Sequence, residues 1–314
     1  MTKIAFVFPG QGAQYVGMGR DIVETYDAAE QVFREASQVL GYDMKKLCFD
    51  GPEEELIKTE NTQPAILTTC MAIATVLENR GIHANLSAGL SLGEYAALVT
   101  AKGLSFQDAV ALVKKRGRYM QDTVPQGEGA MAAILGMERD PLLEVLQEIQ
   151  TEGIVEAANF NSPGQIVISG ESKLVEKACI RAKEAGALKA VLLPVSAPFH
   201  CSLLIPAGEK LAEDLKEIQV NELDIPVVAN VNGDYYKNKE QIKELLVKQV
   251  SRSVLWEDSM IRMLEDGVDT FIEIGPGKSL NQFLKKIMKK TKHHAQIFSI
   301  EDPSSLEDTV KNLL

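Results

Sequence analysis

The segment NLSAGLSLGEYAALVTAKG, residues 85–103, restricts the possible folds more than any other part of this sequence. Its residues predict a short strand, then a tight turn, then a helix. The turn contains GLSLG, which matches a G-x-S-x-G pattern in which small neighbours let a strained backbone project a serine hydroxyl outward. Ser91 is therefore the candidate nucleophile, and a glycine-rich turn with a capping serine is the alternative.

Strands and helices alternate along the rest of the chain. The opening IAFVF predicts a buried strand that ends at a Pro-Gly pair, and IPVVANV and TFIEIGPG predict further strands. Amphipathic helices are expected at 21–40 and 63–79, at IKELLVKQV, and in the lysine-rich segment after Ser279. This alternation favours an α/β fold with a mainly parallel sheet that helices cover.

A smaller unit is expected after Pro125. There GAMAAILG, QIVISG and ALKAVLLPV predict strands, and EVLQEIQ and SKLVEKACIRAKEAG predict helices. The resulting order of strand, helix, strand, helix, strand resembles a ferredoxin-like insertion. We therefore expect residues 127–196 to form a small subdomain within a larger catalytic domain of residues 1–126 and 197–314, with the site between the two.

Composition and charge argue against several classes of protein. The formal net charge of −11 would repel nucleic acid. The four cysteines lie far apart without a C-x-x-C pair, so neither disulfides nor a metal site is expected. The apolar run at the start is far too short to span a bilayer, and no cleavage site follows a long hydrophobic stretch. We therefore expect a cytoplasmic protein with no membrane and no nucleic-acid partner.

A serine hydroxyl attacks carbonyl groups poorly unless a neighbouring base removes its proton. Of the four histidines, His83 precedes the nucleophile strand, and His293 and His294 lie in a lysine-rich stretch. His200, in SAPFHC, is expected at the end of a strand and just before a helix, where α/β proteins collect their site residues. His200 is thus the candidate base, and a purely structural histidine is the alternative.

Two further segments carry groups suited to an anion. Arg116 lies in the helical run DAVALVKKRGRYMQ, where it can share a partly buried face with Val113. Its guanidinium would need an anion there, either a structural carboxylate, which spacing alone favours, or a substrate group. The segment GQGAQ offers backbone amides for an oxyanion hole. Tyr15 takes the place of the third glycine of a dinucleotide-binding loop, which disfavours that function.

Eight motifs follow one another along nearly the whole chain: FPGQGAQ, TQPA, GLSLGEYAAL, RGRYMQ, GAMAAI, NFNSPGQIVISG, APFHC and IEIGPG. In this order they resemble the malonyl-CoA:acyl carrier protein transacylase family of fatty-acid and polyketide synthesis. The resemblance implies an α/β-hydrolase-like domain with an inserted ferredoxin-like subdomain. It also implies ping-pong transfer of a malonyl group from malonyl-CoA to the phosphopantetheine thiol of acyl carrier protein. Coenzyme A thioester is then a substrate, and no cofactor is expected.

The resemblance also implies a role for each matching residue. Ser91 becomes acylated, and His200 acts first as base and then as acid. The glutamine of G-Q-G, Gln11, and the backbone amide after the serine, that of Leu92, form the oxyanion hole. The arginine of the R-G motif, Arg116, pairs with the malonyl carboxylate.

The family orients its histidine with a main-chain carbonyl, and the matching position in LLVKQV is Gln249, so no triad carboxylate is required. Many relatives have histidine immediately before the nucleophile, where this chain has Leu90, which removes a polar group from the turn. Phe199, next to His200, would narrow the space near the malonyl α-carbon and disfavour methylmalonyl groups.

Two other functions use the same residues. A serine esterase would let water attack the acyl-serine, although such enzymes usually carry the histidine near the chain end and more than a hundred residues follow His200 here. A non-catalytic carrier-binding scaffold would have kept the fold and lost turnover. Because acyl carrier proteins are acidic and this chain is acidic too, docking should need a local basic surface, and the lysine-rich run at 285–292 is the candidate.

Overall fold

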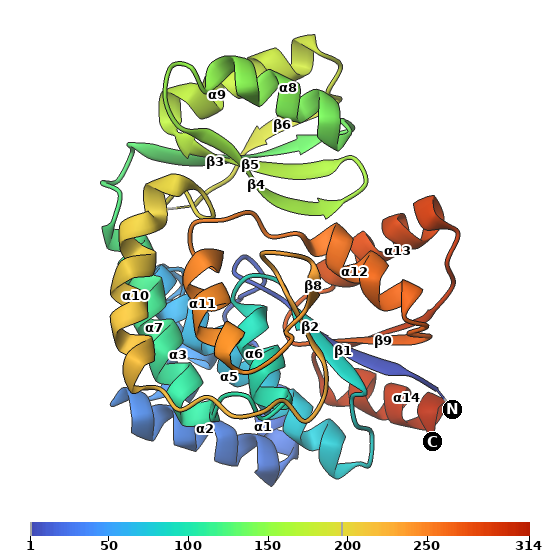
Figure 1. The fold of residues 1–314 in the computed structure, drawn as a ribbon. Coiled ribbons are helices and arrows are strands. Elements are labelled where there is room, and N and C mark those ends of the chain that lie inside the picture. The colour runs from blue at the N-terminus through green and yellow to red at the C-terminus, as the bar shows by residue number, and fades with distance from the viewer. Residues whose placement is uncertain (1, 196) are drawn as a thin grey trace.

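The computed structural model describes residues 2–195 and 197–314, which form two sheets of different size (Figure 1). The larger sheet has six strands in the order β10-β9-β1-β2-β7-β8. Each neighbouring pair is parallel except β7 with β8, which agrees with the prediction of a mainly parallel sheet. Its strands are β1 (Ile4–Phe8), β2 (Leu86–Gly89), β7 (Val227–Ala229), β8 (Asp234–Tyr235), β9 (Thr270–Ile274) and β10 (Gln296–Ile300).

Helices cover both faces of this sheet. No helix in the described part of the chain is long and apolar enough to cross a membrane. The helices of the larger domain are α1 (Arg20–Thr25), α2 (Asp27–Leu40), α3 (Met44–Asp50), α4 (Glu53–Leu56), α5 (Thr59–Asn79), α6 (Gly93–Thr100), α7 (Phe106–Asp122), α10 (Ile205–Glu217), α11 (Glu240–Gln249), α12 (Trp256–Glu265), α13 (Ser279–Thr291) and α14 (Pro303–Leu313).

The apolar run IAFVF explains why β1 lies inside the sheet. Phe6 and Phe8 pack into a core cluster with side chains of α2, α5 and α7. Ala5 and Val7 point to the other face and join a second cluster with side chains of α12 and α13. Because successive side chains of a strand point to opposite faces, a continuous apolar run suits a strand that is covered on both sides.

The helical pattern predicted over 21–40 is present as two helices. Two helices, α1 and α2, meet at Tyr26, whose extended backbone (φ −129, ψ 116) ends one helix and begins the next. The bend lets both helices bury apolar residues, Ile22 from the first and Phe33 from the second. The helix predicted over 63–79 is present as α5 and begins earlier, at Thr59.

The second sheet is antiparallel, with the strand order β4-β5-β3-β6, and α8 and α9 pack on it (Figure 1). The sequence prediction missed β4, because its Asn and Ser residues have weak β-propensity. With β4 the element order becomes that of a ferredoxin-like unit, and the predicted fold class is confirmed.

The boundaries predicted for the small subdomain and the larger domain stay a prediction. The elements are β3 (Gly129–Leu135), α8 (Arg139–Ile149), β4 (Val155–Ser162), β5 (Gln165–Glu171), α9 (Ser172–Glu184) and β6 (Lys189–Leu192).

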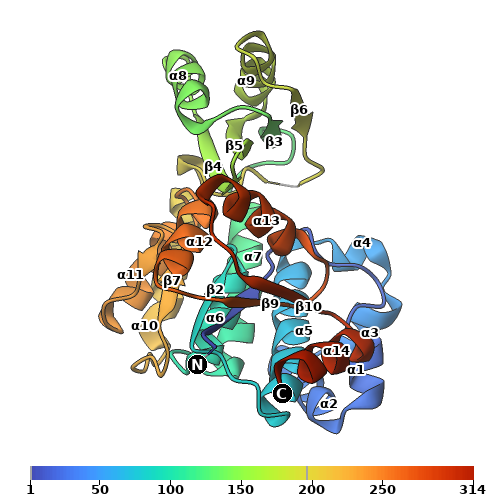
Figure 2. The same ribbon diagram turned by 90° about the vertical axis from the view of Figure 1, so that its right-hand side faces the viewer.

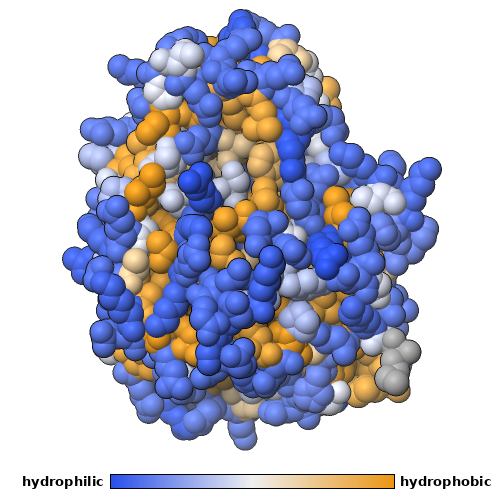
Figure 3. Space-filling view, viewed as in Figure 1, coloured by the Kyte–Doolittle hydropathy of each residue, from blue (hydrophilic) through white to orange (hydrophobic). Residues whose placement is uncertain are grey.

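Hydrogen bonds at β4 and an ion pair at α8 join the small subdomain to the larger domain. The Phe160 N–H donates to the Val254 carbonyl at 2.9 Å, and the Val254 N–H donates to the Ala158 carbonyl at 2.8 Å. Arg139, at the start of α8, forms a two-pronged ion pair with Asp258 of α12. Figure 2 shows the subdomain standing above α12 and α13. On the face drawn in Figure 3, hydrophobic residues gather between hydrophilic ones near the place where the two parts meet.

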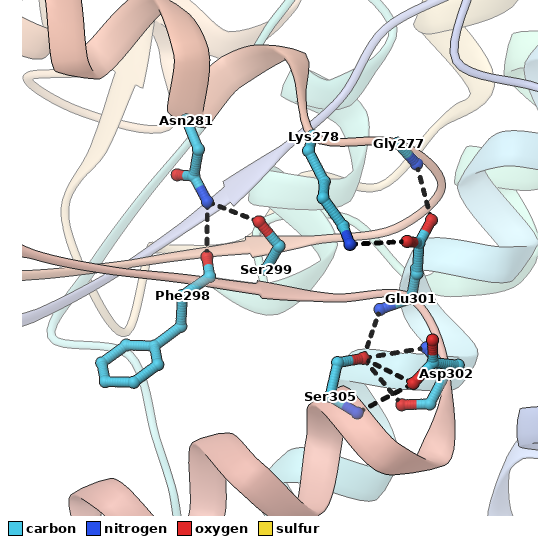
Figure 4. Close-up of polar contacts among 8 residues, drawn as sticks. All are labelled: Gly277, Lys278, Asn281, Phe298, Ser299, Glu301, Asp302 and Ser305. Atoms are coloured by element: carbon cyan, nitrogen blue, oxygen red, sulfur yellow. Dashed lines mark hydrogen bonds and ion pairs between the residues drawn. The ribbon is translucent and has the colours of Figure 1, made fainter.

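Loops from three neighbouring strands meet at the carboxyl edge of the large sheet. A Cβ atom on Gly10, after β1, would lie 2.6 Å from the carbonyl oxygen of Leu90, after β2, so these two loops touch. Figure 4 shows how the loop after β9 is held: Glu301 accepts from the Gly277 N–H at 3.2 Å and pairs with Lys278 at 3.1 Å. Sites of α/β proteins commonly form at this edge.

Candidate active site

The turn around Ser91 has the geometry that its sequence predicts. Ser91 has a φ of 53°, a left-handed conformation that is uncommon for a residue other than glycine. A Cβ on Gly89 would lie 1.9 Å from the Gly93 carbonyl carbon, and a Cβ on Gly93 would lie 2.2 Å from the Phe8 oxygen. Only glycine fits at both positions, so the G-x-S-x-G pattern is needed to bring β2, the turn and α6 this close together.

Ser91 and His200 lie within hydrogen-bonding distance of each other. The Ser91 Oγ and the His200 Nε2 are 2.7 Å apart, and the His200 Nδ1 lies 2.8 Å from the Gln249 main-chain oxygen. Because a carbonyl oxygen only accepts, Nδ1 carries the proton and Nε2 is left to accept from the serine hydroxyl. The structure therefore brings together the predicted nucleophile, the predicted base and the carbonyl expected to orient that base.

The expected position of His200 at the end of a strand is wrong. Strand β6 ends at Leu192, and His200 lies in a later turn with a φ of 60°, just before the short 3₁₀ helix Ser202–Leu204. Pro194 has no N–H to donate to a neighbouring strand, so strand pairing stops before it.

The electrostatic environment favours a neutral His200. The imidazole is 4% exposed, and burial, followed by the nearby Arg116 charge, lowers its pKa from 6.5 to about 3. The hydrogen bond to the Gln249 carbonyl acts in the opposite direction but does not offset these two effects. His200 is therefore unprotonated near neutral pH, as a general base must be.

Arg116 points from α7 directly at the serine. Its Nη2 donates to the Ser91 Oγ at 3.2 Å and to the Gln249 Oε1 at 3.0 Å, and its Nη1 donates to the Gln63 Oε1 at 2.8 Å. The residue is 1% exposed, its Nε has no hydrogen-bond partner, and it forms no ion pair with any carboxylate in the described residues. The structural carboxylate that spacing alone favours is thus absent from them, and a buried guanidinium remains available for an anion.

Comparisons with known proteins identify the family. A family model described as "Acyl transferase domain" matches residues 5–302. The chain is 47% identical over 314 residues to the malonyl CoA-acyl carrier protein transacylase of Bacillus subtilis (strain 168), covering 100% of this chain and 98% of that protein. The chain belongs to the malonyl CoA-acyl carrier protein transacylase family.

Solved structures of this family agree closely with the fold. The malonyl CoA-acyl carrier protein transacylase from Clostridium perfringens has a TM-score of 0.95 and 50% identity, covering 99% of this chain and 97% of that one. A malonyl-transacylase in complex with its type II PKS acyl-carrier protein has a TM-score of 0.95 and 42% identity, covering 99% of this chain and 100% of that one.

The two residues that the family resemblance assigns to the oxyanion hole lie on adjoining turns. Gln11 belongs to the loop after β1, which touches Leu90, and its Nε2 donates to the Thr59 Oγ1 at 3.3 Å. Leu92 follows the nucleophile and caps α6. Their oxyanion role stays a prediction.

Sequence reasoning missed two side-chain amides that hold the site. The Asn230 Oδ1 accepts from the Ser91 N–H at 2.6 Å, and its Nδ2 donates to the Gly89 carbonyl at 2.7 Å. Gln63 anchors Arg116, a role that its motif TQPA does not indicate. Asn230 directly follows β7, so its place at a strand end in the sequence was the signal that could have found it.

The other residues singled out from the sequence take simpler positions in the structure. Leu90 packs its side chain beside Gly10, and Phe199 is buried next to the base. In the basic run at 285–292, Lys286 donates to Gln165 and Lys290 pairs with Glu138, so part of this run binds the small subdomain. The described residues contain no group of His, Cys, Asp or Glu side chains that could hold a metal ion.

Proposed function

We propose that this chain transfers a malonyl group from malonyl-CoA to the phosphopantetheine thiol of acyl carrier protein through a malonyl-Ser91 intermediate. The observation that carries this proposal is the buried Arg116 guanidinium, which lies 3.2 Å from the nucleophile oxygen and has no carboxylate partner in the described residues. A planar, two-pronged donor fits a carboxylate, and malonyl is an acyl group that ends in one.

In the first half-reaction, His200 Nε2 removes the proton of the Ser91 hydroxyl, and Oγ attacks the thioester carbonyl carbon of malonyl-CoA. The 2.7 Å distance between Oγ and Nε2 suits direct proton transfer. The carbonyl oxygen becomes negative, and we assign its stabilisation to the Leu92 N–H and the Gln11 side chain. When the C–S bond breaks, the coenzyme A sulfur leaves with the proton that His200 took up.

In the second half-reaction, His200 removes the proton of the carrier's phosphopantetheine thiol, and the sulfur attacks the malonyl-Ser91 ester carbonyl. The C–O bond then breaks, and Ser91 Oγ regains the proton from Nε2. Thiolate is a better nucleophile than water at neutral pH, and the carboxylate bound by Arg116 helps to keep the ester in a closed, dry cleft. Transfer should therefore win over the hydrolysis that a serine esterase would perform.

No resident cofactor enters this proposal, because the thioester brings its own leaving group and the protein supplies base, nucleophile and charge. We also propose a cytoplasmic location. The support is the set of four cysteines, all of them free and buried, because unpaired thiols are typical of proteins kept in a reducing compartment.

The experiment that tests this function is intact-protein mass spectrometry after mixing with malonyl-, acetyl- or methylmalonyl-CoA, followed by addition of phosphopantetheinylated carrier. We expect a malonyl adduct that disappears as malonyl-carrier forms. Release of free malonate at the same rate with and without carrier would support a hydrolase instead. No adduct with any of the three thioesters would leave only a carrier-binding scaffold.

A further inference from the structure

A buried carboxylate lies directly behind the active site, and no step proposed above uses it. Glu94, in the first turn of α6, has 0% exposure. The Tyr236 hydroxyl donates to its Oε1, and both the Asn230 N–H (3.2 Å) and the Gln249 Nε2 (2.5 Å) donate to its Oε2. Within the part of the chain that the structure describes, Glu94 forms no ion pair. Acidic residues are almost never fully buried without an oppositely charged partner, so this arrangement needs an explanation.

The side-chain amide of Gln249 lies between this carboxylate and Arg116. Its Oε1 accepts from Arg116 Nη2 at 3.0 Å, while its Nε2 donates to Glu94 and, at 2.9 Å, to the Ser91 main-chain oxygen. If the amide turned over, its NH₂ would face the guanidinium N–H and its oxygen would face the carboxylate. Both contacts would then be repulsive, so the acceptor at position 94 acts together with the Ser91 main-chain oxygen to fix which end of the amide faces Arg116.

We propose that Glu94 is a positioning residue for malonyl transfer: its carboxylate fixes the Gln249 amide, which in turn holds the Arg116 guanidinium toward Ser91. This inference rests on the proposed function. The indirect connection has a chemical advantage over a direct ion pair. Gln249 and Gln63 hold Arg116 through neutral oxygens, so no carboxylate of the protein competes with that of the substrate for the guanidinium.

The Glu94 side chain makes no direct hydrogen bond to the nucleophile or to the base. The Ser91 N–H is bound by the Asn230 side chain at 2.6 Å, and His200 is bound by the main-chain carbonyl of Gln249 at 2.8 Å, which the backbone of α11 positions. Loss of the acceptor at Glu94 should therefore disturb Arg116 more than the Ser91–His200 pair. Malonyl-CoA needs the guanidinium to bind its carboxylate, whereas a neutral serine-reactive reagent has no carboxylate to bind.

The test compares these two reagents on Glu94→Met and Glu94→Gln. Methionine has a similar length but no acceptor, and we expect kcat/KM for malonyl-CoA to fall about ten- to a hundredfold, as for other buried donors left without a partner. The second-order rate constant for a neutral fluorophosphonate should change by no more than about threefold. Glutamine keeps a carbonyl oxygen that can accept from Gln249 while its NH₂ faces the Tyr236 oxygen, so Glu94→Gln should recover most of the malonyl activity.

Tyr236→Phe is the matched control. It removes the hydroxyl bonded to Glu94 Oε1 but leaves the Oε2 contact with Gln249, so the ratio of the two rate constants should stay within about twofold of wild type. If Glu94→Met does not fold, Glu94→Asp carries the same test, because it draws the carboxylate back by one methylene and should also lose malonyl activity selectively.

The outcomes separate this inference from the proposed function. Equal losses with both reagents in Glu94→Met, or in its Asp substitute, would overturn the inference, because Glu94 would then support the whole turn. A Glu94→Gln variant as impaired with malonyl-CoA as Glu94→Met would overturn it too. A wild-type protein that forms no malonyl adduct would instead contradict the proposed function.

Discussion

Replacing Arg116 should change which acyl group the protein accepts. The side chain is 1% exposed and donates to neutral oxygens of Ser91, Gln63 and Gln249. In Arg116→Ala, a malonyl carboxylate entering this site would be desolvated without a partner, at a cost of about 2–5 kcal/mol. Since about 1.4 kcal/mol corresponds to a factor of ten, kcat/KM for malonyl-CoA should fall about thirtyfold to several thousandfold. Acetyl has no charge to leave unpaired, so its transfer should be kept or increased.

The assay measures kcat/KM for malonyl-CoA and acetyl-CoA on wild type, Arg116→Ala and Arg116→Lys. Lysine keeps the charge but loses the two-pronged geometry, so malonyl activity should return only in part. Arg118→Ala is the matched control, because Arg118 lies on the same helix, is exposed and pairs with Asp122. Equal losses for malonyl and acetyl in Arg116→Ala would refute the reasoning, since Arg116 would then support structure or coenzyme A binding.

Four further predictions concern the nucleophile, the base and the carrier. Ser91→Ala should abolish the malonyl adduct in mass spectra while the melting temperature stays near that of wild type, and a stable adduct would rule out this nucleophile. His200→Ala should slow acylation by about two to four orders of magnitude in rapid-quench experiments, and near-normal rates would mean another base. Because the His200 pKa is lowered from 6.5 to about 3, the active neutral form persists on acidification. The rate with a neutral fluorophosphonate should then show no decline centred at 6.5 between about pH 5 and pH 8, whereas such a decline would contradict the lowered value. Charge reversal at Lys285 and Lys289, which spares the Lys286 and Lys290 contacts to the small subdomain, should raise KM for the carrier and leave acylation by malonyl-CoA unchanged. If both half-reactions stay the same, this run is only a solvated face.

The parts of the site that the sequence predicted are those encoded by local patterns. The G-x-S-x-G turn depends on close contacts within five consecutive residues and one neighbouring strand, so its glycines reveal it. The parts that it missed depend on distant residues. The strand-end position of Asn230 marks it as a candidate site residue but does not show that it binds the Ser91 backbone. Nothing local to Arg116 indicates that neutral oxygens rather than a carboxylate surround it. Strand β4 was missed for a related reason, since pairing with β5 and the contact with Val254, not propensity, make it a strand.

The backbone strain at Ser91 is offset by hydrogen bonds with side chains that also position the active-site groups. A non-glycine residue held at a φ of 53° costs about 1–3 kcal/mol. Both main-chain polar groups of Ser91 receive side-chain partners, its N–H from Asn230 at 2.6 Å and its oxygen from Gln249 at 2.9 Å. At about 0.5–1.5 kcal/mol each, these two bonds are of the size needed to balance the strain. Gln249, at the end of α11, also accepts from His200 through its main-chain oxygen and from Arg116 through its side-chain oxygen. One residue therefore supports the backbone of the nucleophile turn, the orientation of the base and the guanidinium proposed to bind the acyl carboxylate.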